Sequence, residues 1–234
     1  MISLQKKSLL ILLAAPLISS VSLAADSVKL TTGFFSSDGQ SDIVNIPNSS
    51  TQSIPLMLSV RKGKLSLGLS TGYVSIKSGT LNEAGMGDTT LSLGYTLSDT
   101  FSVKIKEKFA TGDAAKNLST GKEDTSVQLD YFGQVNQSQS LFATAGYKFT
   151  GKVAGANMQD ASYASVGTGY MLASKISIGA SLDFRESSYK TVDSKLGITA
   201  FASKPLSKTY SLAGFAGYDN TQTSSLGVSL TTKF

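Results

Sequence analysis

The last nine residues, from Leu226 to Phe234, constrain the fold more than any other stretch of the chain. Strand side chains alternate between two faces, so the apolar residues here share one face while glycine, serine and lysine share the other. The apolar set comprises Leu226, Val228, Leu230 and Phe234. Chain ends in water are usually polar and frayed. This apolar terminus therefore favours a final strand between lipid and a polar lumen, and an edge strand of a soluble β-sandwich is the alternative.

The opposite end of the chain has the pattern of an export signal. Lys6 and Lys7 precede an apolar run over Leu9–Ile18, and small residues around Ala24 offer a cleavage site for a signal peptidase. This pattern predicts a cleaved signal peptide over residues 1–25 and one mature domain over residues 26–234. No later stretch reaches about 18 consecutive apolar residues, so the sequence predicts no transmembrane helix.

Between these ends, twelve segments alternate apolar and polar residues with a period of two. Most of them reach the roughly 9–11 residues that a tilted strand needs to cross the hydrocarbon core of a membrane. The segments are Ser27–Phe35, Ser53–Arg61, Lys64–Ser75, Asp88–Leu97, Phe101–Phe109, Asp124–Val135, Ser140–Thr150, Ser162–Leu172, Ile176–Arg185, Lys195–Ser203, Tyr210–Tyr218 and Thr223–Phe234. The pattern predicts an all-β fold.

The connections between these segments alternate in length. Tight turns such as Arg61–Lys64 and Ala173–Lys175 alternate with longer polar stretches such as Phe35–Gln52, Ile76–Gly87 and Ala110–Glu123. Outer-membrane barrels have short periplasmic turns and long outer loops, whereas a β-sandwich does not need to sort its loops in this way. We therefore predict a closed antiparallel transmembrane β-barrel of about twelve strands, with both termini in the periplasm.

The composition is consistent with a barrel. Charged residues make up 16% of the chain, against about a quarter in soluble domains, and alternating lipid-facing and lumen-facing residues produce such an average. Cysteine is absent, so a secreted chain of this kind must rely on its backbone ladder and packing. The formal charge of +5 falls to +3 when the two lysines of the signal peptide are removed. A modest, dispersed charge predicts no binding to nucleic acid.

Aromatic residues gather near the ends of the outward faces, where interface belts form. The inner set is Tyr95, Phe101, Tyr170, Tyr210 and Phe234, and the outer set is Phe109, Tyr147, Phe149, Phe184 and Tyr218. Glu107 has outward parity, so we expect it close to the outer rim or beside a bulge. Pro55 cannot donate a ladder bond, so we expect it at a strand start or an irregularity. The parity of Tyr210–Tyr218 is ambiguous, with Tyr210 and Tyr218 favoured outward.

Basic residues outnumber acidic residues on the predicted lumen face, with nine bases against four acids. The bases are Lys29, Arg61, Lys104, Lys106, Lys108, Lys148, Arg185, Lys195 and Lys233, and the acids are Asp88, Asp124, Asp130 and Asp183. Three of the lysines lie on Phe101–Phe109, beside the acids of the next predicted strand, where antiparallel pairing favours opposite charges. Two interpretations stay open: a charge ladder that stiffens the wall, and a polar track for a solute. The candidates for lumen-lining residues are Lys104, Lys106, Lys108, Asp124, Gln128, Asp130, Lys148, Asp183 and Arg185.

The chain contains no histidine and no cysteine. Their absence excludes nucleophilic sites built from Ser-His-Asp or Cys-His groups, and it removes the usual zinc ligands. Acidic residues in the predicted outer loops lack the spacing of a calcium-binding loop, so we expect them to be solvated. The sequence therefore predicts a protein without enzymatic activity, cofactor or metal.

Several short stretches resemble one family of bacterial outer-membrane proteins. They are Thr32–Phe35, Ile54–Ser59, Gly85–Asp88, Lys104–Lys106 and Leu118–Asp130. The family is named for the MetA pathway of phenol degradation, and its members are often labelled transporters. The chain departs from the family at Glu107, where an apolar residue is expected, and in its shortened second and fifth outer loops. The last strand also resembles the carboxy-terminal signal of such barrels, which implies that the barrel-assembly machinery reads its apolar residues.

The resemblance implies a fold but not a substrate. We expect a bacterial outer-membrane channel or transporter that passes a small solute passively, with a weak preference for anions. The alternative is a structural or surface-interaction barrel whose lumen is plugged by its own side chains. Barrels of about eight strands are filled and those of 16–18 are open, so about twelve strands leave both functions possible. The expected partners are outer-membrane lipid, the barrel-assembly machinery and an unidentified small solute.

Overall fold

The computed structural model describes residues 25–40 and 48–234. The predicted signal peptide lies outside these residues, apart from Ala25. The strands found in this part of the chain are β1 (Ser27–Gln40), β2 (Asn48–Lys62), β3 (Leu65–Ser78), β4 (Leu81–Met86), β5 (Thr89–Thr96), β6 (Phe101–Phe109), β7 (Asp124–Gln134), β8 (Gln139–Phe149), β9 (Ala161–Met171), β10 (Ser177–Arg185), β11 (Lys195–Pro205), β12 (Tyr210–Asp219) and β13 (Ser224–Lys233). One 3-10 turn, η1 (Ala114–Lys116), lies between β6 and β7. No helix in the described residues is long and apolar enough to span a membrane.

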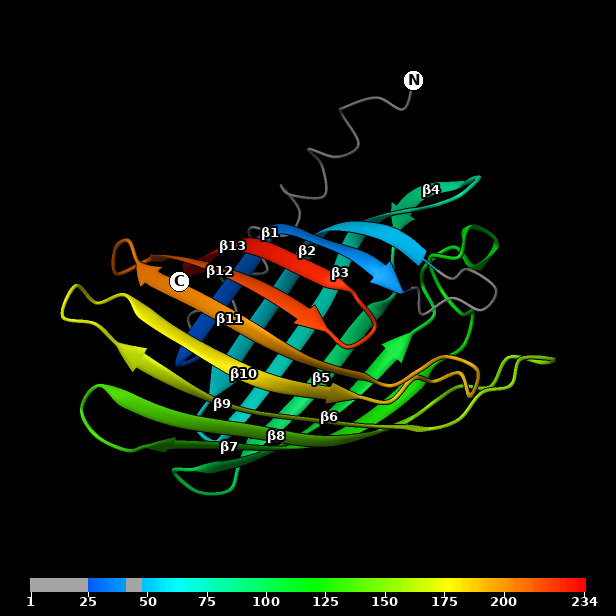
Figure 1. Cartoon of the computed structure of the whole chain (residues 1–234). Helices are drawn as coiled ribbons and strands as arrows, with labels where there is room; N and C mark the ends of the chain where they lie inside the picture. The colour runs from blue at the N-terminus through cyan, green and yellow to red at the C-terminus, as the bar shows by residue number, and fades with distance from the viewer. Residues whose placement is uncertain (1–24, 41–47) are drawn as a thin grey trace, which may run out of the picture.

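The strands form one antiparallel sheet that closes on itself (Figure 1). β1 pairs with β13 from Lys29 opposite Lys233 to Asp38 opposite Ser224, and β2 pairs with β3. The short β4 and β5 both pair with β3, so together they make one strand of the wall. The described residues thus form a closed twelve-stranded barrel, as the sequence predicts, with the first strand beside the last.

The barrel carries most of its large apolar side chains on the outside rather than in a central core. Only five hydrophobic residues of the described part are buried, among them Val28 and Ala161, whereas leucines such as Leu67, Leu93 and Leu182 are about half exposed. Because alternate residues face opposite sides of a strand, this arrangement places the apolar set outward and the polar set toward the lumen. The ambiguous strand β12 follows the predicted parity, since Tyr210 and Tyr218 are among the exposed residues.

The short turns lie at one end of the barrel and the longer loops lie at the other end (Figure 1). The short-turn end holds the four tight connections from β5 to β6, β7 to β8, β9 to β10 and β11 to β12, together with the turn after β2. The long-loop end holds residues 110–123, 150–160 and 186–194. β1 begins and β13 ends at the short-turn end, where Asp26 N donates to Arg61 O over 2.9 Å and Phe234 N donates to Val28 O over 3.0 Å.

The first two predicted loops at the long-loop end are largely strand, which corrects the sequence analysis. β1 continues to Gln40 and β2 starts at Asn48, so most of Phe35–Gln52 is paired backbone. In Ile76–Gly87, Ser78 pairs with Leu81 across a two-residue turn that starts at Gly79, whose φ of 56° suits glycine. Ladder bonds use only the backbone, so strands continue beyond the apolar alternation that marks the membrane-crossing part.

The two residues that departed from the pattern are accommodated differently. Pro55 lies inside β2 opposite Gly72, and the β1–β2 ladder is interrupted where Pro55 lacks a donor. Its placement at an irregularity is confirmed. Glu107 keeps its register, because both ladders of β6 are continuous, and it accepts a 2.6 Å hydrogen bond from Thr125 Oγ1 two residues before β6 ends. The rim position is therefore confirmed, and the alternative of a bulge is wrong.

Candidate functional site

A lysine between two aspartates anchors the polar side of the lumen. Lys108 Nζ lies 3.0 Å from Asp88 Oδ2 and 3.2 Å from Asp124 Oδ2. Asp88 sits in the break between β4 and β5, and its other carboxylate oxygen accepts from Gly112 N over 3.0 Å. The ion pairs therefore tie β5, β6 and β7 to the loop that follows β6. Asp124 is only 8% exposed, and its Oδ1 accepts from Gly151 N over 2.9 Å.

The network continues toward the short-turn end through diagonal contacts. Lys104 Nζ lies 3.4 Å from Asp130 Oδ2, and Lys106 Nζ donates to Gln128 Oε1 over 2.5 Å. Asp130 Oδ1 also accepts from Gln128 Nε2 over 2.6 Å and from Thr144 Oγ1 over 2.7 Å. Diagonal pairs of this kind stabilise antiparallel sheets. We call the resulting set the charged wall: Asp88, Lys104, Lys106, Lys108, Asp124, Gln128 and Asp130.

Tyr163 of β9 extends the charged wall across an intervening strand. Its hydroxyl donates to Gln128 Oε1 over 3.0 Å, and Lys106 Nζ lies 5.8 Å from its ring centroid. The ring passes over Gly146 of β8, where an added Cβ would come within 2.2 Å of Tyr163 Cζ. The sequence pattern does not reveal Tyr163 as a member of this network, because its partners are separated from it by at least one strand and have no fixed spacing along the chain.

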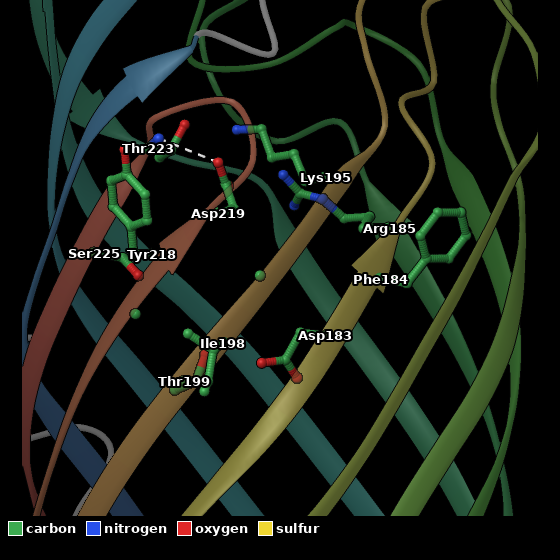
Figure 2. Close-up of a pocket in the computed structure, with 12 residues that line it drawn as sticks. Asp183, Phe184, Arg185, Lys195, Ile198, Thr199, Tyr218, Asp219, Thr223 and Ser225 are labelled. Carbon is green, nitrogen blue, oxygen red and sulfur yellow. Dashed lines mark hydrogen bonds between the residues drawn. The ribbon is translucent and has the colours of Figure 1, made fainter.

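A second charged group, the mouth cluster, lies near the long-loop end of β10, β11 and β12: Asp183, Arg185, Lys195 and Asp219. It surrounds a cavity of about 220 Å³, in which the side chains of Arg185 and Lys195 extend into the same space (Figure 2). Arg185 and Lys195 are direct cross-strand neighbours, an arrangement of like charges that is unfavourable by itself. Lys195 Nζ donates to Gln40 O over 3.1 Å. The acids have local donors: Asp183 accepts from Ser181 Oγ over 2.9 Å, and Asp219 accepts from Thr221 Oγ1 over 2.6 Å.

The predicted lumen residues therefore separate into two groups. Six of them form the charged wall, while Asp183 and Arg185 belong to the mouth cluster. Lys148 lies between these groups, because it lines a cavity of about 160 Å³ together with Asp124 and Arg185. Lys195 and Asp219 are members of the mouth cluster that the set of candidates did not include. Asp219 ends β12 on the inward parity, although the predicted strand stopped one residue earlier at Tyr218.

Four phenylalanines form a different surface on the inner side of β8, β11, β12 and β1. The rings of Phe142 and Phe201 meet with centroids 5.8 Å apart, although their strands are separated by β9 and β10. They reach each other over Gly167 and Gly179, where an added Cβ would lie 2.3 Å from the Cζ of the ring. Phe35 and Phe215 meet in the same way over Gly227, with centroids 5.3 Å apart. We call these residues the aromatic wall: Phe35, Phe142, Phe201, Phe215, Gly167, Gly179 and Gly227.

The last strand closes the barrel and carries the predicted assembly signal. Leu226, Val228 and Leu230 expose 56, 47 and 39% of their surface on the outside of β13, and Phe234 exposes 52%. Their outward position agrees with the alternation in the sequence, whereas their recognition by assembly machinery stays a prediction. Within residues 25–40 and 48–234, no three histidine, cysteine or acidic side chains are placed to share a metal ion.

Comparison with known proteins relates the chain to outer-membrane channels in fold. No protein-family model matches the sequence and no curated protein does, so membership of the family named for phenol degradation stays a prediction. The COG4313 outer membrane channel from Pseudomonas putida F1 is 14% identical, with a TM-score of 0.69 over 89% of this chain and 95% of that one. The KdgM porin, solved with disordered oligogalacturonate, is 13% identical, with a TM-score of 0.59 over 88 and 99%. The CymD monoaromatic hydrocarbon channel is 13% identical, with a TM-score of 0.52 over 93 and 92%.

These comparisons and the geometry define a class of fold. The chain is a closed, antiparallel, twelve-stranded β-barrel of the kind seen in outer-membrane channel structures, with an apolar outer surface and charged residues on its inner wall. Identities near 14% establish this fold but do not transfer a substrate.

Proposed function

We propose that the protein is a passive channel of the bacterial outer membrane for a small solute. The exposed apolar side chains outside the barrel suit contact with lipid, and the similar structures carry the names of channels and porins. The signal-peptide pattern supports export to the envelope. A barrel of this type needs no catalytic group, so we expect no enzymatic activity.

The observation that carries this proposal is the way in which inward side chains lie along the wall. In the charged wall, each long side chain contacts a residue on the next strand or the one after it, as Lys104 contacts Asp130 over 3.4 Å. In the aromatic wall, rings lie over glycines of neighbouring strands. Side chains that lie along the inner wall fill less of the cross-section of the lumen than side chains that point toward the barrel axis. This arrangement favours a channel over a barrel plugged by its own side chains.

A weak anion preference follows from the balance of inward charges. With Asp219, which lines the same cavity as Asp183, the predicted inward set comprises nine bases and five acids. Three lysines and three aspartates of the charged wall balance each other, which leaves six bases against two acids elsewhere. Charge on a pore wall attracts ions of opposite sign, so the preference should come chiefly from residues outside the charged wall, with the mouth cluster and Lys148 nearest the entrance.

Single-channel recording in planar bilayers tests the proposed function. The purified protein should conduct, and its reversal potential in a potassium chloride gradient should show weak preference for chloride that weakens as salt is raised, because screening lengths are about 10 Å at 0.1 M. A variant with Lys148→Gln and Lys195→Gln should lose part of this preference. Absence of conductance from correctly folded protein would favour the structural or surface-interaction barrel.

We further propose that the barrel-assembly machinery recognises the last strand. Phe234→Asp should reduce the yield of folded barrel in outer membranes while leaving export across the inner membrane intact, because the resembled signal ends on an aromatic residue. Phe234→Tyr, which keeps an aromatic residue at the end of the chain, is the matched control and should give the parent's yield. Equal heat-modifiable yields from Phe234→Asp and the parent would contradict this assignment.

A further inference from the structure

An uncharged cavity lies on the inner face near the short-turn end, away from the mouth cluster. It encloses about 320 Å³, and its inward-facing residues include Phe132, Gln134, Ser140, Phe142, Ser177 and Phe201. None of the described residues that line it is charged. The cavity thus differs in chemistry from the one between Arg185 and Lys195, although both open on the same lumen.

The aromatic side of this cavity is built in advance. Phe142 and Phe201 lie over the backbones of β9 and β10 and hold each other at 5.8 Å between centroids, with their planes inclined by 55°. Glycines 167 and 179 leave the space for these rings, and a Cβ at either position would overlap them. Two rings from strands that are not neighbours are therefore fixed side by side, so a ligand would not have to order them.

Phe132 adds an apolar surface to the inner face of β7, whose other inward positions are all polar. Its side chain exposes 56% of its surface, although its partner across the β7–β8 ladder is Phe142, whose ring is only partly exposed. An apolar surface left open toward water is a common mark of a binding site. Gln134, Ser140 and Ser177 provide amide and hydroxyl groups at the edge of the same cavity.

We propose that this cavity binds a small uncharged ring compound that has an apolar face and hydrogen-bonding groups on its rim. Ring faces pack favourably against apolar and aromatic faces, and amides and hydroxyls satisfy polar substituents without a charge. A charged ligand would lose hydration without gaining a counter-charge from the lining residues. A volume of about 320 Å³ falls at the small end of known ligand pockets, which are about 300–1,000 Å³. The inference rests on the proposed channel function only in placing the site on the path of the solute.

Equilibrium binding to the purified protein in detergent micelles tests the site without relying on conduction. Benzyl alcohol and methyl glucopyranoside are the probes, because both carry an apolar face and hydroxyl groups while only the first is aromatic. Saturation-transfer NMR should detect binding of at least one of them. The double variant Phe142→Leu, Phe201→Leu should raise the dissociation constant of the bound probe about tenfold. Each aromatic contact contributes about 0.5–1.5 kcal/mol, and about 1.4 kcal/mol corresponds to a tenfold change in the dissociation constant.

Phe149→Leu is the matched control. Phe149 also belongs to an aromatic pair on β8, with Tyr147 at 5.0 Å, but its side chain is on the outer face. The control should bind the probes as the parent does, and it corrects for probe that partitions into the micelle. Equal binding by the parent, the double variant and the control would overturn the site, as would binding of benzoate as tightly as benzyl alcohol.

The same preparations separate this inference from the proposed function. A protein that conducts ions but binds neither probe would remove the site and leave the channel. A protein that binds a probe at the aromatic rings but conducts nothing would keep the site and remove the channel function. Preference for benzyl alcohol over the glucoside would identify an aromatic ring as the ligand, and the reverse would identify a sugar ring.

Discussion

The lumen has two walls that are built from opposite chemistry. In the charged wall, two lysines of β6 form ion pairs with three aspartates, and Lys106 donates to Gln128. Gln128, which is 7% exposed, joins this network to Tyr163. In the aromatic wall, phenylalanine rings rest over glycines and make no polar contact of their own. Both walls direct long side chains along the sheet. The charged wall achieves this by pairing side chains, and the aromatic wall by removing a Cβ.

The difference determines what each wall can tolerate. A paired charge depends on its partner, because removal of one member leaves the other partly buried and uncompensated. A ring over glycine depends on the empty space below it, since any added Cβ must move the ring. Substitutions should therefore disturb the charged wall through electrostatics and the aromatic wall through shape, which makes the comparison testable.

Replacing all three lysines of the charged wall should have the largest effect. Lys104→Gln, Lys106→Gln and Lys108→Gln together remove three positive charges and leave Asp88, Asp124 and Asp130 without their ion pairs. Each lost charged hydrogen bond should cost about 1.5–3 kcal/mol of unfolding free energy. The reversal potential in a salt gradient should move toward preference for cations.

The matched variant replaces the three aspartates of the charged wall with asparagine, and it should move the reversal potential in the opposite direction. An unchanged reversal potential in both conducting variants would mean that these residues do not face the conduction path. The two open interpretations of the ladder would then be resolved in favour of a structural role.

Gly146→Ala should have the next largest effect, because it disturbs the charged wall through shape. The three heavy atoms nearest the added Cβ belong to Tyr163, at 2.2–2.5 Å, so the ring must move and its hydroxyl must leave Gln128. The Gln128 amide keeps its hydrogen bonds with Lys106 and Asp130, so the expected cost is one hydrogen bond, about 0.5–1.5 kcal/mol, together with about 1–3 kcal/mol for the overpacked ring. Denaturant unfolding of the reconstituted barrel measures this loss.

Tyr163→Phe is the control for Gly146→Ala, since it removes the same hydroxyl without moving the ring. If Gly146→Ala destabilises the barrel no more than Tyr163→Phe does, the loss is a hydrogen bond alone. A stability equal to the parent's in Gly146→Ala would show that the ring has room to move, and the idea of a glycine-dependent position would fail.

Gly227→Ala should have a smaller effect and should act on the aromatic wall alone. The added Cβ would lie 2.4 Å from Phe215 Cε1 and 2.6 Å from Phe35 Cδ1. Moving the two rings apart should cost about 0.5–1.5 kcal/mol of unfolding free energy. It should also reduce single-channel conductance, because at least one ring must turn toward the axis.

Adding Phe35→Ala and Phe215→Ala to Gly227→Ala should restore conductance, since neither side chain then reaches the added Cβ. Restored conductance with unchanged ion preference would separate the aromatic wall from the charged wall. Conductance that stays low in this triple variant would assign the loss to a change in the sheet rather than to ring position.

The sequence predicts the charged wall better than the aromatic wall, for a physical reason. Lys104, Lys106 and Lys108 share one face of one strand, so the period of two places them together, and the next strand supplies the acids. The rings of Phe142 and Phe201 meet across two strands, and their contact depends on glycines elsewhere in the chain. The spacing of residues within a single segment therefore cannot predict that these two rings touch.

The same reasoning explains which parts of the fold were predicted. Closure of β1 on β13 follows from alternation and loop lengths, both of which are local. The hairpin at Ser78–Leu81 was missed because polar residues lie on both faces once a strand leaves the membrane. Asp88 was assigned to a strand, whereas it occupies the break between β4 and β5, where it can contact both Lys108 and Gly112.

The smallest effect is expected outside both walls, in the loop from β8 to β9. Asp160 accepts hydrogen bonds from Lys152 Nζ over 2.7 Å and from Thr150 N over 3.1 Å. The hydrogen bond from Lys152, followed by that from Thr150, lowers the pKa of Asp160 below its ordinary value of 3.8.

A carboxyl group with a lowered pKa stabilises the fold above its ordinary pKa, and this contribution is lost as the pH falls through the lowered pKa. At pH 7 the Tm of Asp160→Asn should thus be slightly lower than that of the parent. The two Tm values should converge as the pH is lowered below 3.8. Because 34% of the Asp160 side chain and 53% of the Lys152 side chain are exposed, the difference at pH 7 should be small and should shrink in high salt. A difference that persists unchanged in acid would show that the side chain acts through its shape rather than its charge, which would align this loop with the aromatic wall rather than the charged wall.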